Sequence, residues 1–178
     1  MNIRKGESIV FAASTAEIKS GSLKKLFDDE VNERNPRDNF FHCLVNAAHQ
    51  FHISMKNDDR YLLAGYPWFK CRARDMFIAL PGLTLSIEER EYFELVLKTA
   101  ERGLMEFMEG KPLTVKIAEI EQPDVLLWVI WCLQQYAKDV GLEACLKRYR
   151  KLTKTILQFI ETGQHPNLEV KENGLLYT

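Results

Sequence analysis

Apolar residues at helical spacing run through most of this chain, and they constrain its fold more than any other feature. Phe41, Leu44, Val45 and Ala48, for example, recur every three or four positions, which places them on one face of a helix. The same period recurs in several other segments, so we expect an all-α protein whose neighbouring helices pack antiparallel. Helices are expected over residues 23–33, 40–55, 86–108, 124–138 and 142–161, with a shorter candidate over 74–80.

Extended segments are short and few. Residues 7–13 (ESIVFAA) combine apolar and β-branched side chains, which is typical of a strand. A lone strand is unstable by itself, so we expect this piece to belong to a preceding β domain. Residues 1–35 are therefore expected to be the end of that domain and a linker helix, ahead of a helical domain over residues 36–178. Other short pieces are ambiguous or extended: 61–69, 113–120, 168–170 and 175–177.

Three sites carry specific signals for helix boundaries. Ser86 with Glu89 three residues later matches a capping box, which predicts a helix start at Ser86. Gly141 is expected to end the preceding helix. The dipeptide at positions 81–82, Pro-Gly, is expected to end the short helix over 74–80.

The overall charge of the chain argues against two classes of partner. Its 24 Lys and Arg residues balance 25 Asp and Glu residues, so the net charge of -1 attracts neither nucleic acid nor an anionic membrane. No apolar run reaches the ~18 residues that a membrane span needs, and the first residues lack the apolar core of a signal peptide. We therefore expect no nucleic acid and no membrane as partners.

Motifs for metals and cofactors are not found in the sequence. It has no P-loop, no GxGxxG, no GxSxG and no zinc-ligand pair, so neither a metal nor a cofactor is expected. His42, His49 and His52 fall near one face of the expected helix over 40–55, but ordinary interior or surface histidines are the favoured interpretation. The cysteines are scattered and form no CxxC pair, which favours a reduced, cytoplasmic protein. They are Cys43, Cys71, Cys132 and Cys145.

The densest group of candidate functional residues lies at positions 64–75 (AGYPWFKCRARD), where Pro67 prevents a regular helix. Aromatic faces such as those of Tyr66 and Trp68 stack on the apolar face of a sugar ring, and Arg74 and Asp75 can bind its hydroxyls with paired hydrogen bonds. This mixture favours sugar binding. The alternative, that the aromatic side chains fill a core and Arg74 and Asp75 form a surface ion pair, stays open on composition alone.

Acidic residues ahead of the helix over 124–138 form a second group. Glu119, Glu121 and Asp124 come before the apolar run over 125–131, and acids at a helix N-terminus are expected on electrostatic grounds alone. The functional interpretation is a carboxylic acid at the mouth of a pocket, whose pKa is raised by aromatic neighbours so that it can donate a proton. Both interpretations are compatible with the residues.

The segment over 64–83 closely resembles a family pattern. Residues 64–69 (AGYPWF), then Arg74 and Asp75, then residues 78–83 (IALPGL) are similar to the AGYPWFxxWGRDTxIALPGL pattern of bacterial and archaeal glycogen debranching enzymes, the amylo-α-1,6-glucosidases. Residues 123–131 (PDVLLWVIW) resemble the VDASLWFIWA helix of that family. Residues 47–51 and 173–176 also agree with it, so the resemblance runs from about position 40 to the end.

This resemblance implies a fold, a reaction and roles for five residues. The implied fold is an (α/α)6 barrel, with its first half over 36–178, and the implied partner is glycogen or another branched α-glucan. The implied reaction is inverting hydrolysis of α-1,6 branch stubs, in which one carboxylic acid protonates the leaving oxygen and one carboxylate activates water. By resemblance, Asp124 is the general acid, Arg74 and Asp75 hold the terminal glucose, and Tyr66 and Trp68 line its pocket.

Three departures from the pattern matter. Arg72 stands where the family usually has Trp, Ala73 where it has Gly, and Met76 where Thr is common. The family's catalytic base is a Glu beyond the position matching Thr178, so we expect this chain alone to be inactive. A half-barrel also exposes apolar surface, so self-association is expected. The alternatives are another glucoamylase-like glucosidase, a non-catalytic glucan-binding module, or a helical interaction module.

Overall fold

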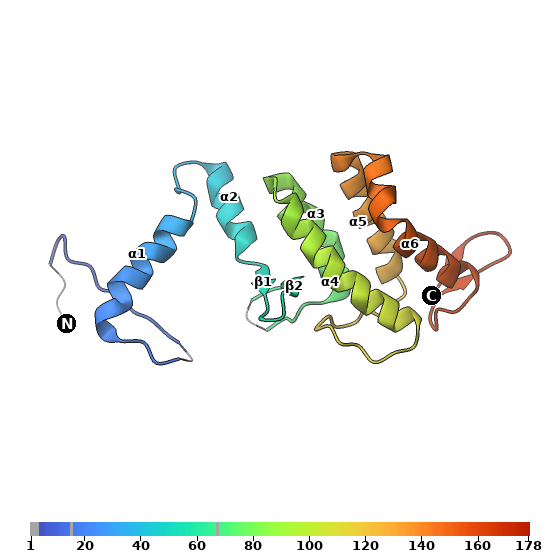
Figure 1. Cartoon of the computed structure of the whole chain (residues 1–178), viewed down its shortest axis with the longest axis horizontal. Coiled ribbons are helices and arrows are strands. Elements are labelled where there is room, and N and C mark those ends of the chain that lie inside the picture. Colours follow the sequence, from blue (N-terminus) through green and yellow to red (C-terminus); the bar gives the residue numbers. More distant parts are fainter. Residues whose placement is uncertain (1–3, 15, 67) are drawn as a thin grey trace. The chain divides into compact units, whose positions relative to one another are not determined.

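The computed structural model describes residues 4–14, 16–66 and 68–178, and within them the chain is mostly helical (Figure 1). The sequence prediction of an all-α protein is confirmed at this level, while two small strand pairs interrupt the helices. The helices are α1 (Leu23–Glu33), α2 (Phe40–His49), α3 (Ala73–Leu83), α4 (Arg90–Met108), α5 (Val125–Val140) and α6 (Leu142–Glu161), with 3-10 helices η1 (Ser20–Ser22) and η2 (Leu85–Ile87). The strands are β1 (His52–Ser54), β2 (Arg60–Leu62), β3 (Glu169–Val170) and β4 (Leu176–Tyr177). Among these described residues, no helix is long and apolar enough to cross a membrane.

The chain divides into two compact units, Met1–Asn46 and Ala47–Thr178. In the first unit, α1 is amphipathic but buries none of its residues, and Leu26, Phe27 and Val31 on its apolar face are exposed. Asn35 and Asn46 join the segment before α2 to that helix. The Asn35 N–H donates to Asn46 Oδ1 (3.1 Å), and Asn46 Nδ2 donates to the Asn35 carbonyl (2.9 Å).

The predicted strand over residues 7–13 is wrong, because this segment has no regular secondary structure. Phe11 is 84% exposed, and no strand among the described residues pairs with the segment. Strand formation requires a hydrogen-bonding partner, and local β propensity cannot supply one.

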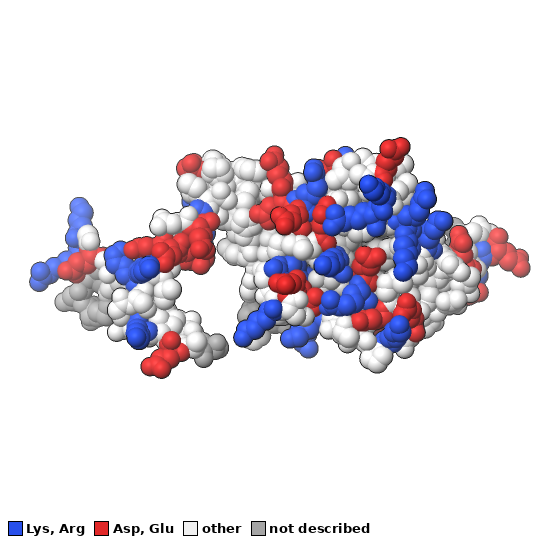
Figure 2. All heavy atoms as spheres, viewed as in Figure 1, with Lys and Arg blue, Asp and Glu red and all other residues white. Residues whose placement is uncertain are grey.

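The core of the second unit lies between its helices. Helix α5 packs against both α3 and α6 (Figure 1). Gly141, with a φ of 89°, is the single residue between α5 and α6, and it lets the chain reverse so that Tyr136 of α5 contacts Tyr149 of α6. Acidic and basic side chains are interspersed on the face of this unit drawn in Figure 2. The largest fully buried side chains of the helices include Phe77, Leu80, Phe93, Leu97, Leu126 and Leu152.

The predicted helix over 40–55 ends early, at His49, and the chain continues as strand β1. Strands β1 and β2 form an antiparallel hairpin in which Ile53 faces Tyr61. Asp58 takes a left-handed backbone conformation in the turn (φ 63°), and Tyr61 and Leu62 are only 1% exposed. Burial of β2 against α4 decides the structure here, and the helical period of residues 41–51 does not contain that information.

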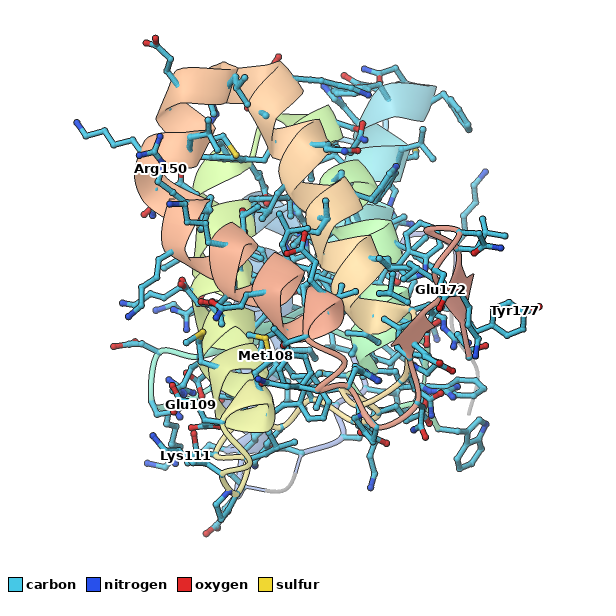
Figure 3. All side chains as sticks on the ribbon, turned by 90° about the vertical axis from the view of Figure 1, so that its right-hand side faces the viewer. Met108, Glu109, Lys111, Arg150, Glu172 and Tyr177 are labelled. Atoms are coloured by element: carbon cyan, nitrogen blue, oxygen red, sulfur yellow. The ribbon has the colours of Figure 1, made fainter. Side chains whose placement is uncertain are left out.

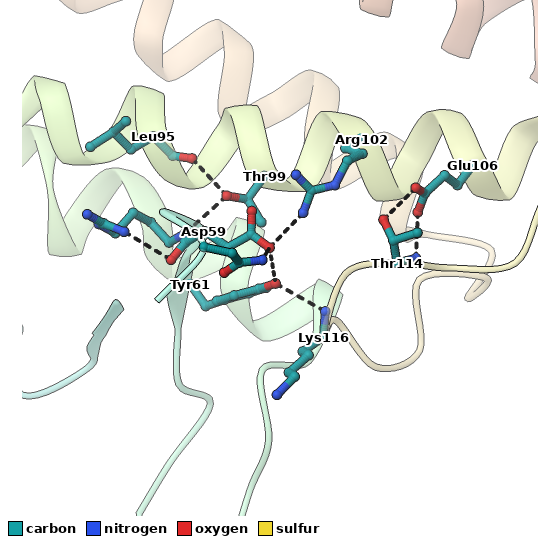
Figure 4. Close-up of polar contacts among 10 residues, drawn as sticks. Asp59, Tyr61, Leu95, Thr99, Arg102, Glu106, Thr114 and Lys116 are labelled. Carbon is teal, nitrogen blue, oxygen red and sulfur yellow. Dashed lines mark hydrogen bonds and ion pairs between the residues drawn. The ribbon is translucent and has the colours of Figure 1, made fainter. Parts of the chain in front are cut away.

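A buried carboxylate holds this hairpin to α4 (Figure 4). Asp59 accepts hydrogen bonds from Arg102 Nη2 (2.6 Å), Asn57 Nδ2 (2.8 Å) and the Tyr61 hydroxyl (3.1 Å). Burial acts to raise the pKa of Asp59, but these hydrogen bonds outweigh it and the pKa is lowered. The Tyr61 hydroxyl in turn accepts from the Lys116 N–H (3.2 Å), so the network reaches the loop after α4.

Two other predicted helix boundaries move. Ser86 does not cap α4, because it lies inside η2, and α4 begins at Arg90 without a side-chain cap. Glu88 takes a left-handed conformation (φ 65°) that separates the two helices. Helix α3 runs to Leu83 and contains Pro81, so the predicted end of this helix before Pro81 is wrong.

The loop between α4 and α5 packs closely on α4. Residues 113–120, ambiguous from sequence, form a loop with one isolated bridge, in which Ala118 pairs with Arg72. Gly103 makes the close approach possible, because a Cβ there would lie 2.4 Å from Val115 Cγ2 and 3.3 Å from Ile120 Cδ1. The loop that leads to Asp124 is thus seated on a helix position where a side chain would not fit.

The C-terminal segment forms the expected short extended pieces, as the antiparallel pair β3 and β4 (Figure 3). Figure 3 labels Glu172 and Tyr177 on this hairpin. His165, 3% exposed, precedes it and contacts the rings of Phe107 and Phe159 edge to face. Its Nδ1 accepts from the Asn167 N–H (3.1 Å), and burial lowers its pKa.

Candidate functional site

The packing of α3 against α5 brings together two residues that are far apart in sequence. Arg74 lies in the first turn of α3 and Asp124 immediately precedes α5. Arg74 Nε lies 2.8 Å from Asp124 Oδ2, and its Nη2 donates to Asp124 Oδ1 at 2.8 Å. The planar guanidinium therefore binds both carboxylate oxygens in a bidentate contact, which is the strongest geometry for an Arg–carboxylate pair.

Asp124 is held in its ionised form by these contacts. Trp128, one turn into α5, donates its indole Nε1–H to Asp124 Oδ2 (3.1 Å). Burial acts to raise the pKa of Asp124, but the hydrogen bonds from Arg74 and Trp128 outweigh it, so the pKa lies below its usual value. A raised pKa, expected of a resting proton donor, is therefore not what this arrangement produces.

A second Arg–carboxylate pair lies beside the first. Arg72 Nε and Nη2 donate to the two carboxylate oxygens of Glu119 at 2.6–3.0 Å. Arg72 Nε also lies 3.7 Å from Asp75 Oδ2. The backbones are joined as well, since the Ala73 N–H donates to the Ala118 carbonyl (2.9 Å). Arg72 and Glu119 belong to two separate candidate segments of the sequence, and nothing in the sequence indicates that residues so far apart would pair.

The aromatic side chains of the 64–75 segment face solvent. Tyr66 is 57% exposed, Trp68 84% and Phe69 52%, so the interpretation that they fill a core is wrong. The Tyr66 hydroxyl donates to the Gln50 carbonyl, which ties this segment to the end of α2. Pro67 lies outside the described residues. In the part of the chain that is described, neither Tyr66 nor Trp68 hydrogen-bonds to the Arg74–Asp124 pair.

Asp75 opens onto a hollow of about 450 Å³ along α3. Phe51, Leu63 and Ile78 supply apolar walls, and Asp75 supplies a carboxylate at the lining. Arg74 and Asp75 do not form the surface ion pair considered from sequence, because the partner of Arg74 is Asp124. An apolar wall beside a carboxylate suits a ligand with both apolar faces and hydroxyls.

The histidines lie elsewhere in the fold. His52 is in β1, so the expectation that His42, His49 and His52 share a helix face is wrong. His49 Nε2 contacts Glu89 Oε1, and His52 Nδ1 lies 3.5 Å from the other oxygen of Glu89. His52 also stacks on Tyr92, with ring centroids 4.0 Å apart. Within residues 4–14, 16–66 and 68–178, no group of three His, Cys, Asp or Glu side chains is placed to hold a metal ion.

Comparison with protein families gives a match over most of the chain. The family model described as Amylo-alpha-1,6-glucosidase matches residues 45–178, about three quarters of the chain. The matched region contains α3, α5, the aromatic segment and both Arg–carboxylate pairs. No curated protein and no solved structure matches the chain. The match covers well over half of the sequence, and the chain belongs to the amylo-alpha-1,6-glucosidase family.

Proposed function

We propose that this chain carries the sugar-binding and proton-donating part of a glycoside hydrolase that removes α-1,6-linked glucose stubs from glycogen or limit dextrin with inversion. The observation that carries the proposal is the two-point contact between Arg74 and Asp124. It joins a residue proposed to hold the glucose to the residue proposed to protonate the glycosidic oxygen. Membership in the family supports the reaction class.

The proposed roles follow from the chemistry of each side chain. Asp124 is the general acid, Arg74 and Asp75 bind hydroxyls of the terminal glucose, and Tyr66 and Trp68 offer ring faces to further glucose units. The exposed rings of Tyr66 and Trp68 support this role, because a sugar can reach them. The hollow beside Asp75 supports a place for the glucose ring.

The lowered pKa of Asp124 requires a step before proton transfer. While Arg74 grips Asp124, the carboxylate is ionised and cannot donate a proton. A glucose hydroxyl that accepts from Arg74 would draw the guanidinium away from Asp124. Loss of that cation, together with exclusion of water by the sugar, raises the pKa of the carboxyl group toward the value that a proton donor needs.

The second carboxylate of the inverting mechanism is assigned only by resemblance. Inversion needs the two carboxyl groups ~6.5–9.5 Å apart, with a water molecule between one of them and the sugar. The resemblance places that base after the position of Thr178 and implies an (α/α)6 barrel that residues 36–178 begin. We therefore propose that residues 1–178 alone bind the glucan without turnover. We also propose that the protein is cytoplasmic.

One observation favours a second candidate, a glucan-binding module without catalysis. Asp124 is engaged by Arg74 and Trp128 in a way that keeps it ionised, which suits a structural carboxylate. The two candidates differ in what sugar does to Asp124. Binding raises the pKa of a general acid, whereas a structural carboxylate stays paired with Arg74.

The experiment is a titration of the Asp124 carboxyl carbon by NMR, with and without saturating branched dextrin, beside an assay of glucose release. The proposed hydrolase predicts binding, a rise in the pKa of Asp124 on binding, and no glucose from residues 1–178. Binding without a change in that pKa identifies the non-catalytic module. A folded chain that binds no branched dextrin contradicts both candidates.

A further inference from the structure

We infer that Glu119 is a positioning residue, which acts through Arg72 to fix the geometry of the Arg74–Asp124 pair. The effect of Glu119 on sugar binding rests on the proposed function, whereas its effect on the Arg74–Asp124 pair does not. Glu119 and Asp124 lie close together in the last part of the loop between α4 and α5, and their partners Arg72 and Arg74 lie at the start of α3. Two Arg–carboxylate contacts therefore fasten the loop to the helix side by side.

The backbone of Glu119 is held in an unfavourable conformation. Its φ is 60°, in the left-handed region that residues with a side chain rarely adopt. Among the described residues, two other non-glycine residues share this feature, but Asp58 lies in the hairpin turn and Glu88 ends η2. At Glu119 the conformation accompanies a carboxylate bound by both Nε and Nη2 of Arg72. Such strain persists where the surrounding contacts enforce it.

The contact is unsuited to stabilising the fold. The side chain of Arg72 is 38% exposed and that of Glu119 is 40% exposed, and ion pairs that open to water contribute little to stability. A glycine at position 119 would remove the backbone strain. The left-handed backbone at Glu119 is thus a cost that a half-exposed ion pair offsets only in part, and stability alone does not account for this residue.

What the contact does is fix the first turn of α3. Arg72 is the residue before α3, and its side chain is bound by Glu119 while the next N–H is bound by the Ala118 carbonyl. Arg74 follows two residues later, and its two-point contact with Asp124 depends strongly on the angle at which the guanidinium arrives. Arg72 also reaches toward Asp75 (3.7 Å), so the same contact restrains the second sugar-binding candidate.

The test replaces Glu119 by glycine and observes the neighbouring pair directly. The Trp128 indole N–H reports on Asp124, to which it donates, and the Arg74 Nε–H reports on the ion pair. In Glu119→Gly, we expect a melting temperature equal to or above that of the wild type, a shifted Trp128 indole resonance and faster exchange of the Arg74 Nε–H. Glu119→Gln, whose amide oxygen can still accept from Arg72, should restore both signals in part.

The control is Glu121→Gln, on the same loop, where the side chain is exposed and forms no ion pair among the described residues. This variant should leave both resonances as in the wild type. Unchanged Trp128 and Arg74 signals in a folded Glu119→Gly would overturn the inference. If Glu119→Gly fails to fold, Arg72→Lys, which loses the two-point contact, decides the same question by the same signals.

Sugar binding separates this inference from the proposed function. If the wild type binds branched dextrin, we expect Glu119→Gly to weaken the affinity about tenfold, the loss typical of one misplaced charge-assisted hydrogen bond. If the wild type binds no dextrin, the proposed function fails, and the two resonances still decide whether Glu119 positions the pair. Unaltered affinity in a variant whose Trp128 and Arg74 signals have moved would contradict the role in sugar binding.

Discussion

At the scale of single residues, the protonation of Asp124 governs what the site can do. Its contacts with Arg74 and Trp128 lower its pKa, while the proposed reaction needs a proton on it. The sequence alone singles out these residue types, because their mixture favours sugar binding, and that role stays a prediction. Their pairing was not, because the pattern places Arg74 next to Asp75, whereas the fold presents Arg74 to Asp124.

The ion pair makes a prediction about the Asp124 carboxyl group. Arg74→Gln removes the cation and its two-point contact with Asp124, so the pKa of Asp124 should rise toward or above its ordinary value. Carboxyl-carbon NMR titration measures this rise. Arg90→Gln, which breaks the remote Arg90–Asp139 pair, is the matched control and should leave the Asp124 titration unchanged.

Asp59 makes a prediction about stability. The Asp59 side chain is only 6% exposed, and its carboxylate accepts hydrogen bonds from Arg102 and the Tyr61 hydroxyl. Asp59→Asn removes this charge, so the free energy of unfolding should fall by about 2 kcal/mol. Because the pKa of Asp59 is lowered by folding, this contribution is complete above its ordinary value of 3.8. The contribution is lost as the pH falls through the lowered pKa of Asp59 in the folded chain. The wild type and Asp59→Asn should therefore have the same free energy of unfolding in strong acid.

Urea unfolding at several pH values provides the measurement. Asp58→Asn is the matched control, since the side chain of Asp58 is 99% exposed, and it should change little at any pH. An equal loss of stability in both variants would mean that the hydrogen bonds of Asp59 add no more stability than an exposed aspartate in the same turn.

At the scale of elements, local pattern predicted the helices better than their ends. Helices α1 and α6 have the bounds that apolar spacing indicates, because each has one continuous apolar face. The end of α2 and the start of α4 were wrong, because the β1–β2 hairpin and η2 depend on packing between distant segments. The loop before α5 was ambiguous for the same reason, as its position depends on the close approach at Gly103.

Gly103 makes a prediction about that loop. Gly103→Ala gains helix propensity of about 1 kcal/mol, but its Cβ would lie 2.4 Å from the stiff Val115 side chain, so we expect a net loss of ~1–2 kcal/mol. Gly82→Ala in α3 meets nothing within 4 Å and should be neutral or stabilising. Thermal unfolding measures the stability of the two variants. Equal melting temperatures would contradict the prediction, because they would show that the loop moves to accommodate the added Cβ at no cost in stability.

His165 makes a prediction about the C-terminal hairpin. Burial lowers its pKa below 6.5, so the folded chain resists protonation while the unfolded chain accepts it. Stability should therefore be constant above about pH 6.5 and fall as the pH drops from there toward the folded pKa. Unfolding curves from pH 8 to 5 measure this slope, which His165→Phe should reduce. The remaining slope is expected from His52, whose pKa is also lowered by burial. A slope equal to that of the wild type after the substitution would contradict the prediction.

At the scale of the whole molecule, membership in the family covers residues 45–178 and leaves the first unit without an assigned role. Exposed apolar side chains occur in both units, including Phe27 and Val31 on α1 and Ile78 beside the hollow on α3. We predict that the chain self-associates as its concentration rises, because apolar patches of this kind favour burial between copies. Sedimentation velocity measures this, and a monomer at every concentration would contradict it.

The most direct measurement of the central claim is an NMR titration of the chain with a glucan fragment that carries one α-1,6-linked glucose. We predict saturable shifts of the Arg74 Nε–H and the Trp128 indole N–H in the wild type. The shift of the Trp128 indole N–H should be lost in Arg74→Gln and Asp75→Asn variants that stay folded. If the two residues were only structural, both substitutions would lower the melting temperature. In that case, or if the folded wild type shows no saturable shift, the account of this site as a sugar-binding centre is wrong.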